Sequence, residues 1–403
     1  MTFDVSAFRA EFAFFQQQPD WVYLDNAATM HKPAAVISAE TEFYQKFNSN
    51  VHRGAHQLSQ QATALFEQAR DDIARILNAA HREEIIWCSG ATAALNQLAA
   101  GLTGTVLQAG DRVLLTTLEH HANIVPWQFY AQQHGVILDV VPLTAAHRLD
   151  VVEFQRLLSL KPKVVSLSHV SNVLGHIQPI AELIQLAKAA GALTVIDGAQ
   201  GIVHQLPDLQ QLDCDFYVFS GHKIYGPTGV GVLYGRKHLL EQLKPLLYGG
   251  EMIRHVSFSE TKLNHLPYRL EAGTPNIAGA IGLAAALRWL KQWDLPAIQQ
   301  HKQQLLQHLW HGLAQMPAIE LLSGKTGNAG IVAFNIHGEH PSDVAALLDQ
   351  QQIAVRAGTH CAMPLFQAIG RSGAVRLSLA AYTQASDIDR TLAAIEQAVA
   401  LLE

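Results

Sequence analysis

The sequence predicts an α/β fold, because apolar segments of strand length alternate with amphipathic segments of helix length from about residue 21 to about residue 276. Most of the strand-like segments are continuous apolar runs, which are typical of strands covered by helices on both faces. The chain has 403 residues, of which 49% are hydrophobic. This length exceeds the size at which a single core is usual, so we expect two lobes.

Five apolar segments predict strands of the larger lobe. They are EIIWC before Ser89, RVLLTT before Leu118, VVSLSHV from Val164, LTVID ending at Asp197 and DFYVFS ending at Ser220. Between them, residues 181–190 space their apolar side chains as a helix does, and Gly191 follows where that helix should stop.

Three regions are expected along the chain. Residues 1–20 form an N-terminal arm that packs with the smaller domain, and residues 21–276 form the large domain. Residues 277–403 begin with a long helical stretch rich in Ala, Leu and Gln and continue with strands at GIVAFNI and IAVRA, which predicts a smaller C-terminal domain.

Charge and cysteine content limit the class of protein. Charged residues make up 15% of the chain and the formal net charge is −6, so no basic field is expected to hold nucleic acid or an anionic membrane. Small molecules and proteins are the expected partners. Three scattered cysteines do not make a disulfide framework, and the acidic N-terminal segment and the lack of a long apolar run predict a cytoplasmic protein.

A lysine follows one predicted strand in a turn with polar neighbours. Lys223 lies in SGHKIYGPTGVG with Ser220 and His222, and glycines flank it on both sides. An amine attached to a sheet in this way can form a Schiff base with an aldehyde, while Ser and His side chains can donate hydrogen bonds to a phosphate. One strand earlier, Asp197 ends LTVID, where a carboxylate can keep a pyridine nitrogen protonated.

A third feature is a predicted anion site. Ser89, Gly90, Ala91 and Thr92 join a strand to the helical segment ALNQLAAGL, and backbone N–H groups at a helix start bind anions. Taken singly, each of the three features is more often a cap or a solvated turn. Their order on successive strands indicates a site for pyridoxal 5′-phosphate (PLP).

With these features in place, the sequence resembles the fold-type I PLP-dependent enzymes, which are class-V aminotransferase-like, and specifically the group II cysteine desulfurases and selenocysteine lyases of the Suf type. The resemblance covers nearly the whole chain. It implies a large domain with a mostly parallel mixed sheet between helices and a smaller α+β C-terminal domain. It rests on YLDNAAT from Tyr23, NVHRGAH from Asn50, EHHANIVPW from Glu119, HVSNVLG from His169, DGAQ from Asp197, SGHKIYGPTGVG from Ser220, EAGTPN from Glu271 and VRAGTHCAMP from Val355.

The resemblance also implies roles for individual residues. Lys223 carries the cofactor as a Schiff base, Asp197 pairs with its ring nitrogen, Gln200 bonds its phenolic oxygen, and His120 stacks on the ring and takes part in catalysis. The phosphate is held by Thr92, Ser220 and His222, with Thr274 reaching in from a second subunit, so a homodimer is expected. The substrate carboxylate is bound by Arg376 with help from Asn172 and Arg356, and His52 lies nearby.

Two positions depart from the resemblance. Relatives commonly read RGTT where this chain has Ser89 to Thr92, so phosphate binding is expected to depend more on backbone N–H groups. Many group II members have two histidines before the cysteine, whereas here Thr359 precedes His360.

The cysteine expected to handle sulfur is Cys361, which lies in a short loop with His360, and a nearby imidazole and two arginines favour its thiolate. Cys88 and Cys214 lie in apolar segments and are expected to be inert. The resemblance implies that Lys223 removes the Cα proton of L-cysteine and that Cys361 attacks the substrate sulfur, giving L-alanine and a persulfide. A SufE-like or SufU-like acceptor protein then collects the sulfur, for iron–sulfur clusters or another sulfur cofactor.

Alternatives remain open. Selenocysteine lyase activity on L-selenocysteine is the nearest, and an aminotransferase or epimerase on the same fold is another. A metal-binding protein with Glu119, His120 and His121 as a nucleus is disfavoured, because adjacent residues on a strand face opposite sides, and no metal is expected. A catalytically silent scaffold is disfavoured by the intact Lys223 and Asp197.

Overall fold

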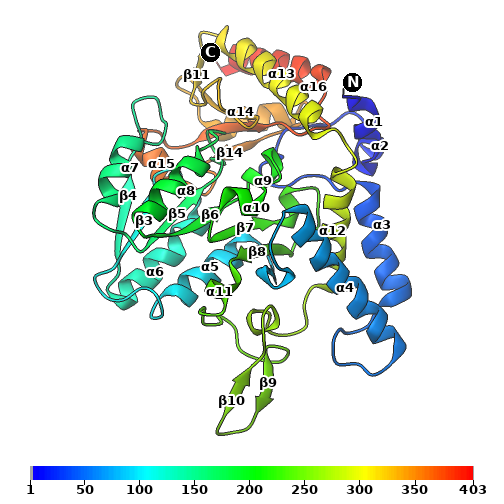
Figure 1. The fold of residues 1–403 in the computed structure, drawn as a ribbon. Helices are drawn as coiled ribbons and strands as arrows, with labels where there is room; N and C mark the ends of the chain where they lie inside the picture. The colour runs from blue at the N-terminus through cyan, green and yellow to red at the C-terminus, as the bar shows by residue number, and fades with distance from the viewer. Residues whose placement is uncertain (1–2, 403) are drawn as a thin grey trace.

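A seven-stranded mixed sheet forms the centre of the larger lobe in the computed structural model, which describes residues 3–402 (Figure 1). Across the sheet the strands follow the order β2, β8, β7, β6, β5, β3, β4, and β8 alone runs antiparallel to its neighbours. The predicted α/β class is therefore confirmed. The strands are β2 (Ile85–Cys88), β3 (Arg112–Thr116), β4 (Ile137–Val141), β5 (Val164–Ser168), β6 (Leu193–Asp197), β7 (Phe216–Ser220) and β8 (Gly231–Gly235).

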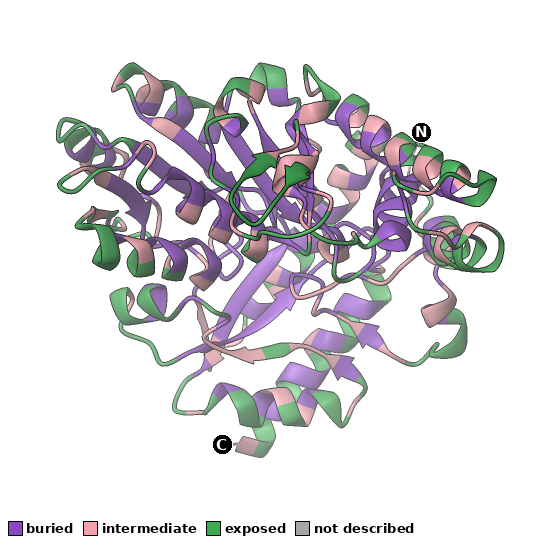
Figure 2. Cartoon of the chain, turned by 90° about the horizontal axis from the view of Figure 1, so that it is seen from below, coloured by how far each residue is buried: buried purple, intermediate pink, exposed green. Residues whose placement is uncertain are grey.

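Alternate residues of each central strand enter different cores. In β7, Phe216 and Val218 belong to one apolar cluster, while Tyr217 and Phe219 belong to the cluster on the opposite face. Both faces are covered by helices, so β5, β7 and β8 are buried along their whole length, and exposed residues lie mainly on the outer sides of the helices (Figure 2). This double burial explains the continuous apolar runs in the sequence.

Helices surround the large sheet. The predicted helix over residues 181–190 is α8, and Gly191 follows it with a left-handed φ of +82°. The helices are α3 (Ala34–Glu42), α4 (Gln57–Ile76), α5 (Ala91–Leu102), α6 (Val125–His134), α7 (Val151–Leu158), α8 (Ile180–Ala189), α9 (Gly201–His204), α10 (Leu209–Leu212), α11 (Lys237–Leu240) and α12 (Ile277–Leu290).

The smaller lobe contains a four-stranded antiparallel sheet in the order β11, β12, β15, β14. The predicted strand GIVAFNI is β12, and IAVRA divides into β13 and the start of β14. The elements are β11 (Ile319–Leu321), β12 (Ile331–Ile336), β13 (Ile353–Ala354), β14 (Arg356–Gly358), β15 (Ala374–Ser378), α13 (Leu295–Ala314), α14 (Pro341–Asp349), α15 (Met363–Ala368) and α16 (Ala385–Leu402).

The predicted N-terminal arm, described from residue 3, contains α1 (Val5–Ala10) and α2 (Ala13–Gln17). Arg9 forms an ion pair with Asp387 of the smaller lobe, and Phe12 packs against both Tyr382 and Trp289. The arm therefore touches the smaller lobe and also α12, which itself packs on α3 and α4 of the larger lobe. Strand β1 (Val22–Tyr23) pairs with β13 of the smaller lobe. The chain therefore still contacts the smaller lobe just after residue 21, where the large domain was expected to begin. The division at residue 277 stays a prediction.

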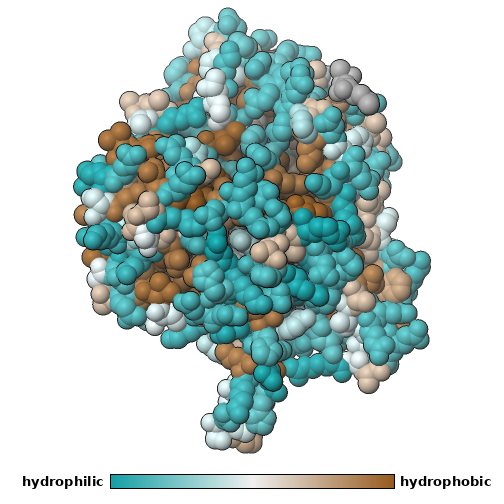
Figure 3. All heavy atoms as spheres, in the orientation of Figure 1, coloured by the Kyte–Doolittle hydropathy of each residue, from teal (hydrophilic) through white to brown (hydrophobic). Residues whose placement is uncertain are grey.

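One hairpin, β9 (Ile253–Val256) and β10 (Thr261–Leu263), projects from the larger lobe (Figure 1). Most of its residues are exposed, and hydrophilic residues predominate on the face drawn in Figure 3. Within residues 3–402, no helix combines the length and apolar character that crossing a membrane requires.

Candidate active site

A cavity of about 430 Å³ opens at the carboxyl ends of β5, β6 and β7 and is closed on the other side by the smaller lobe. Carboxyl ends of parallel strands are where α/β proteins bind ligands. The structure brings together here every predicted site residue except His52 and Thr274. They are Thr92, His120, Asn172, Asp197, Gln200, Ser220, His222, Lys223, Arg356, Cys361 and Arg376.

Lys223 and Asp197 come from neighbouring strands. Lys223 lies in a single 3₁₀ turn directly after β7, and Asp197 is the last residue of β6. Burial lowers the pKa of Lys223, and the charge of Asp197 opposes that change in part. Burial also raises the pKa of Asp197, whose Oδ1 accepts a hydrogen bond from the Ala199 N–H at 2.9 Å. The pair thus combines an amine whose pKa is lowered with a carboxylate that forms no ion pair among the described residues.

The start of α5 faces the same cavity. Gly90 is the N-cap of α5, and the Ala91 N–H donates to Ser220 Oγ at 2.8 Å. A Cβ atom at Gly90 would lie 3.1 Å from Ser220 Oγ, so glycine allows this close approach. Thr92 lies one residue further along and lines the same cavity, and a helix start with neighbouring hydroxyls is the kind of place where anions bind.

His120 lies at the start of a short 3₁₀ helix (His121–Asn123) and not on a strand. The expectation that His120 and His121 lie on a strand and face opposite sides of it is therefore wrong. Its Nδ1 accepts a hydrogen bond from the Ala122 N–H at 3.0 Å, which leaves the proton on Nε2. Burial, followed by the charge of Lys223, lowers the pKa of His120 to about 4, so the ring is neutral at pH 7. Within residues 3–402, no three His, Cys, Asp or Glu side chains form a group that could hold a metal ion.

Two arginines meet a carboxylate that the sequence reasoning did not identify. Asp25 Oδ1 accepts from Arg376 Nη2 at 3.0 Å, and its Oδ2 accepts from Arg356 Nε at 3.2 Å. Arg376 Nη1 also donates to the Asn172 carbonyl at 2.9 Å, whereas its buried Nε has no partner within the described residues. Asp25 stands in the YLDNAAT segment two residues after β1, and a carboxylate close to the end of a strand is the signal that could have revealed it.

Cys361 is exposed, and hydrogen bonds hold the loop that carries it. The His121 N–H donates to the Cys361 carbonyl at 2.7 Å, and Asn172 Nδ2 donates to the His360 carbonyl at 2.7 Å. His360 and Cys361 both adopt left-handed φ values, +49° and +55°. These bonds attach the loop of the smaller lobe to the larger lobe.

His360 cannot assist the thiolate as a cation. Burial lowers the pKa of His360 to about 3, and its Nε2 donates to the Ala374 carbonyl at 3.0 Å. A neutral imidazole adds no positive charge beside Cys361, so among the groups expected to favour its thiolate only Arg356 and Arg376 bring positive charge to the cavity. Burial raises the pKa of both Cys88 and Cys214 to about 12, which makes both thiols poor nucleophiles at neutral pH.

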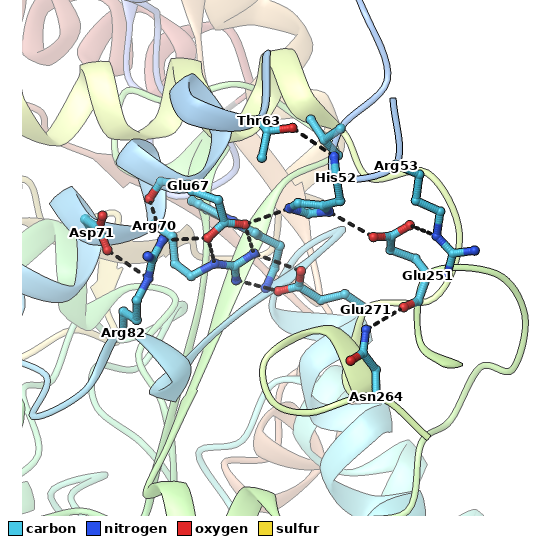
Figure 4. A network of polar contacts seen from close by, with 12 residues as sticks. His52, Arg53, Thr63, Glu67, Arg70, Asp71, Arg82, Glu251, Asn264 and Glu271 are labelled. Carbon is cyan, nitrogen blue, oxygen red and sulfur yellow. Dashed lines mark hydrogen bonds and ion pairs between the residues drawn. The ribbon is translucent and has the colours of Figure 1, made fainter. Parts of the chain in front are cut away.

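His52 lies outside the cavity of its own chain, in a network of ion pairs (Figure 4). Its Nδ1 is 2.9 Å from Glu251 Oε1, and its Nε2 is 3.0 Å from Glu67 Oε1. Burial alone would lower the pKa of His52, but the hydrogen bonds and charges of these carboxylates raise it.

Thr274 is exposed and lines a different pocket, together with Trp87 and Gly229. A single chain therefore does not bring Thr274 or His52 to the predicted ligands.

Comparison with known proteins gives consistent results. The family described as aminotransferase class-V matches residues 22–391. The chain belongs to the class-V aminotransferase family. Over the full length of both chains it is 47% identical to a "Probable cysteine desulfurase" of Vibrio cholerae. It also matches the crystal structure of the cysteine desulfurase CsdA (S-sulfonic acid) from Escherichia coli, with 41% identity, full coverage of both chains and a TM-score of 0.93. The apo structure of a cysteine desulfurase from Thermococcus onnurineus matches with 37% identity, 98% coverage of each chain and a TM-score of 0.93.

These relatives place the chain among the cysteine desulfurases of that family. The family resemblance expected from the sequence is confirmed, and so is the expected large, mostly parallel mixed sheet between helices.

Proposed function

We propose that this chain is a PLP-dependent cysteine desulfurase that converts L-cysteine to L-alanine and retains the sulfur on Cys361 as a persulfide. One observation carries the proposal: the exposed Cys361 shares a single cavity with a buried lysine and two arginines. An aminotransferase or epimerase reaction forms and breaks no bond to sulfur, so neither reaction requires that thiol.

The cavity fits the cofactor. Lys223 would attach it, and the buried Asp197 carboxylate, which has one backbone N–H partner, would receive a protonated ring nitrogen. Thr92, Ser220, His222 and the start of α5 would hold its phosphate, Gln200 would bond its phenolic oxygen, and the neutral ring of His120 would stack on it. When bound, the cofactor supplies an electron sink that stabilises negative charge on the substrate Cα.

Arg376 is the proposed carboxylate ligand. It is almost fully buried, and its Nε has no partner within residues 3–402, so a planar carboxylate can complete its hydrogen bonds. Asp25 and the Asn172 carbonyl hold the guanidinium in place. Arg356 is more exposed and closes the same side of the cavity.

Proton and sulfur transfer fall to Lys223 and Cys361. Burial lowers the pKa of Lys223, which favours the neutral amine that can accept the Cα proton. The Cys361 thiolate forms a bond to the substrate sulfur, and the carbon–sulfur bond breaks with its electron pair moving to the carbon side. That carbon takes up one proton to give the methyl group of alanine, and the persulfide stays on Cys361.

The direct test measures products from L-cysteine. The wild type should form alanine, together with sulfide when a thiol reductant is present, and Cys361→Ser should form neither while keeping its bound cofactor. Cys88→Ser is the matched control and should keep full activity, since Cys88 lies outside the active-site cavity and desolvation raises the pKa of its thiol. A keto acid in place of alanine would instead indicate an aminotransferase.

We further propose a homodimer in which Thr274 and His52 serve the partner's site. In support, Thr274 is exposed and neither residue lines the cavity of its own chain. Light scattering would measure the mass in solution, and in a dimer Thr274→Ala should weaken cofactor binding. If the protein is a monomer that binds cofactor normally, this assignment is wrong.

We also propose that an acceptor protein takes the outer sulfur atom of the persulfide. The sulfur would serve the synthesis of iron–sulfur clusters or another sulfur cofactor in the cytoplasm. Supporting this, Cys361 is exposed and Met363 beside it is 61% exposed, so the loop offers a contact surface. A SufE-like or SufU-like protein should increase the steady-state rate and acquire sulfur from the enzyme. The selenocysteine lyase alternative is not favoured, since the relatives reported above are cysteine desulfurases.

A further inference from the structure

A second cavity, of about 460 Å³, lies where α9, α12 and α13 meet, and we call it the Lys302 cavity. Its walls are largely apolar and include Ile202, Leu206 and Ile298, and it contains none of the predicted catalytic residues. Lys302 of α13 and His204 at the end of α9 supply polar atoms to its lining.

Lys302 is an unusual residue for such a place. Its side chain is only 4% exposed, and lysine is almost never fully buried without a partner. Burial lowers the pKa of Lys302 to about 8, and no carboxylate of the described residues opposes that change. The amine is still mostly protonated at pH 7, so a positive charge is buried in the cavity wall with no counter-charge paired to it among the described residues.

His204 adds a second unsatisfied group. Its Nδ1 is buried and has no hydrogen-bond partner within residues 3–402. His204 and Lys302 line the same cavity, and burial, followed by the charge of Lys302, lowers the pKa of His204 to about 4. A neutral imidazole with its proton on Nδ1 can donate one hydrogen bond.

The only carboxylate in the lining of the Lys302 cavity is otherwise engaged. Asp208 lies at the exposed rim, where it accepts hydrogen bonds from Asn78 Nδ2 and the Gln211 N–H at 2.9 Å each and caps α10. Lys291, also exposed at the rim, adds a positive charge at the entrance. One buried amine, one hydrogen-bond donor and apolar walls match a ligand with a single negative charge and a hydrocarbon tail.

We propose that the Lys302 cavity binds a small apolar carboxylate, with its carboxylate against Lys302 and His204 and its tail along Ile202, Leu206 and Ile298. The site is separate from the substrate site, although α9 begins directly after Gln200, which lines the active-site cavity.

The probes are straight-chain carboxylates from propanoate to hexanoate, titrated calorimetrically into the holoenzyme. Each added methylene that becomes buried should tighten binding about fourfold. The alcohol of the same length as hexanoate should bind at least about tenfold more weakly, because it lacks the charge that pairs with Lys302.

Variants separate this cavity from the active site. Lys302→Met should weaken hexanoate binding about tenfold or more, and Lys262→Met on the exposed hairpin is the matched control that should not. Leu206→Trp, at a half-buried position, should block the cavity without removing the amine, and it serves as the test if Lys302→Met fails to fold. Arg376→Met should leave this binding intact.

Three results would overturn the proposal. They are the absence of binding across the series, binding that survives both Lys302→Met and Leu206→Trp, and binding that is lost in Arg376→Met.

Discussion

The buried pair of Arg70 and Glu271 should be a major source of stability, and Glu271→Gln tests this. Arg70 is fully buried in α4, and it donates to both oxygens of Glu271, from Nη1 at 2.6 Å and from Nη2 at 2.9 Å (Figure 4). Glu271 Oε1 also accepts from the Trp87 N–H at 2.7 Å. A glutamine keeps one oxygen for these donors but turns an N–H₂ group toward the other guanidinium nitrogen.

The expected cost follows from the charge that remains. Removing one partner of a buried ion pair costs about 3 kcal/mol or more, because the other charge stays buried. Arg70 retains Glu67 at 3.2 Å, which places the estimate at the lower end, about 3 kcal/mol. Unfolding entropy of about 2.1 cal/mol/K per residue then converts this into a fall in Tm of about 3–4 °C for a chain of this length.

Differential scanning calorimetry of the holoenzyme measures the shift. Glu153→Gln is the matched control, since Glu153 pairs with Arg156 on the exposed surface of α7 and its loss should leave Tm unchanged. Equal shifts in the two variants, or no shift in Glu271→Gln, would refute the assigned role of the buried pair.

Two further predictions concern the active site, and a third concerns the packing at the start of α9. Iodoacetamide at mildly alkaline pH should label the native protein once, at Cys361, because desolvation raises the pKa of the Cys88 and Cys214 thiols. Intact mass should show labelling of all three cysteines only after unfolding. Labelling of a second thiol in the native state would contradict the low reactivity assigned to Cys88 and Cys214. Gly201→Ala should lower the melting temperature strongly, because the new Cβ would lie 2.1 Å from His169 Nδ1. Gly249→Ala is the control and should leave the melting temperature unchanged, because no atom lies within 4 Å of a Cβ placed there. Equal melting temperatures of the two variants would contradict this. Arg376→Met should raise KM for cysteine about tenfold to a hundredfold and leave the cofactor spectrum intact, and an unchanged KM would exclude it as the carboxylate ligand.

The central strands were predictable because burial on both faces demands continuous apolar residues. Other strands carry no such signal. β4 lies at the sheet edge, and three of its five residues have apolar side chains that are partly or fully exposed. β8 begins and ends with glycine, and in the sequence it resembles a continuation of the glycine-rich loop that follows Lys223.

Site residues at strand ends were equally predictable, because Asp197 and Lys223 follow apolar runs. Asp25 was not recognised, since its role depends on Arg376 and Arg356, which stand more than three hundred residues away along the chain. The neutrality of His360 follows from its burial, and sequence alone does not reveal that burial.

The central claim is that sulfur moves from cysteine to Cys361 with the help of Lys223. The most direct test is the mass of the Cys361 peptide after brief exposure of the holoenzyme to L-cysteine, without reductant and with alkylation to trap the product. The proposed function predicts one additional sulfur atom on that peptide in the wild type and in Cys88→Ser, and none in Lys223→Ala. Alanine production without added sulfur on Cys361, or sulfur added equally in Lys223→Ala, would contradict it.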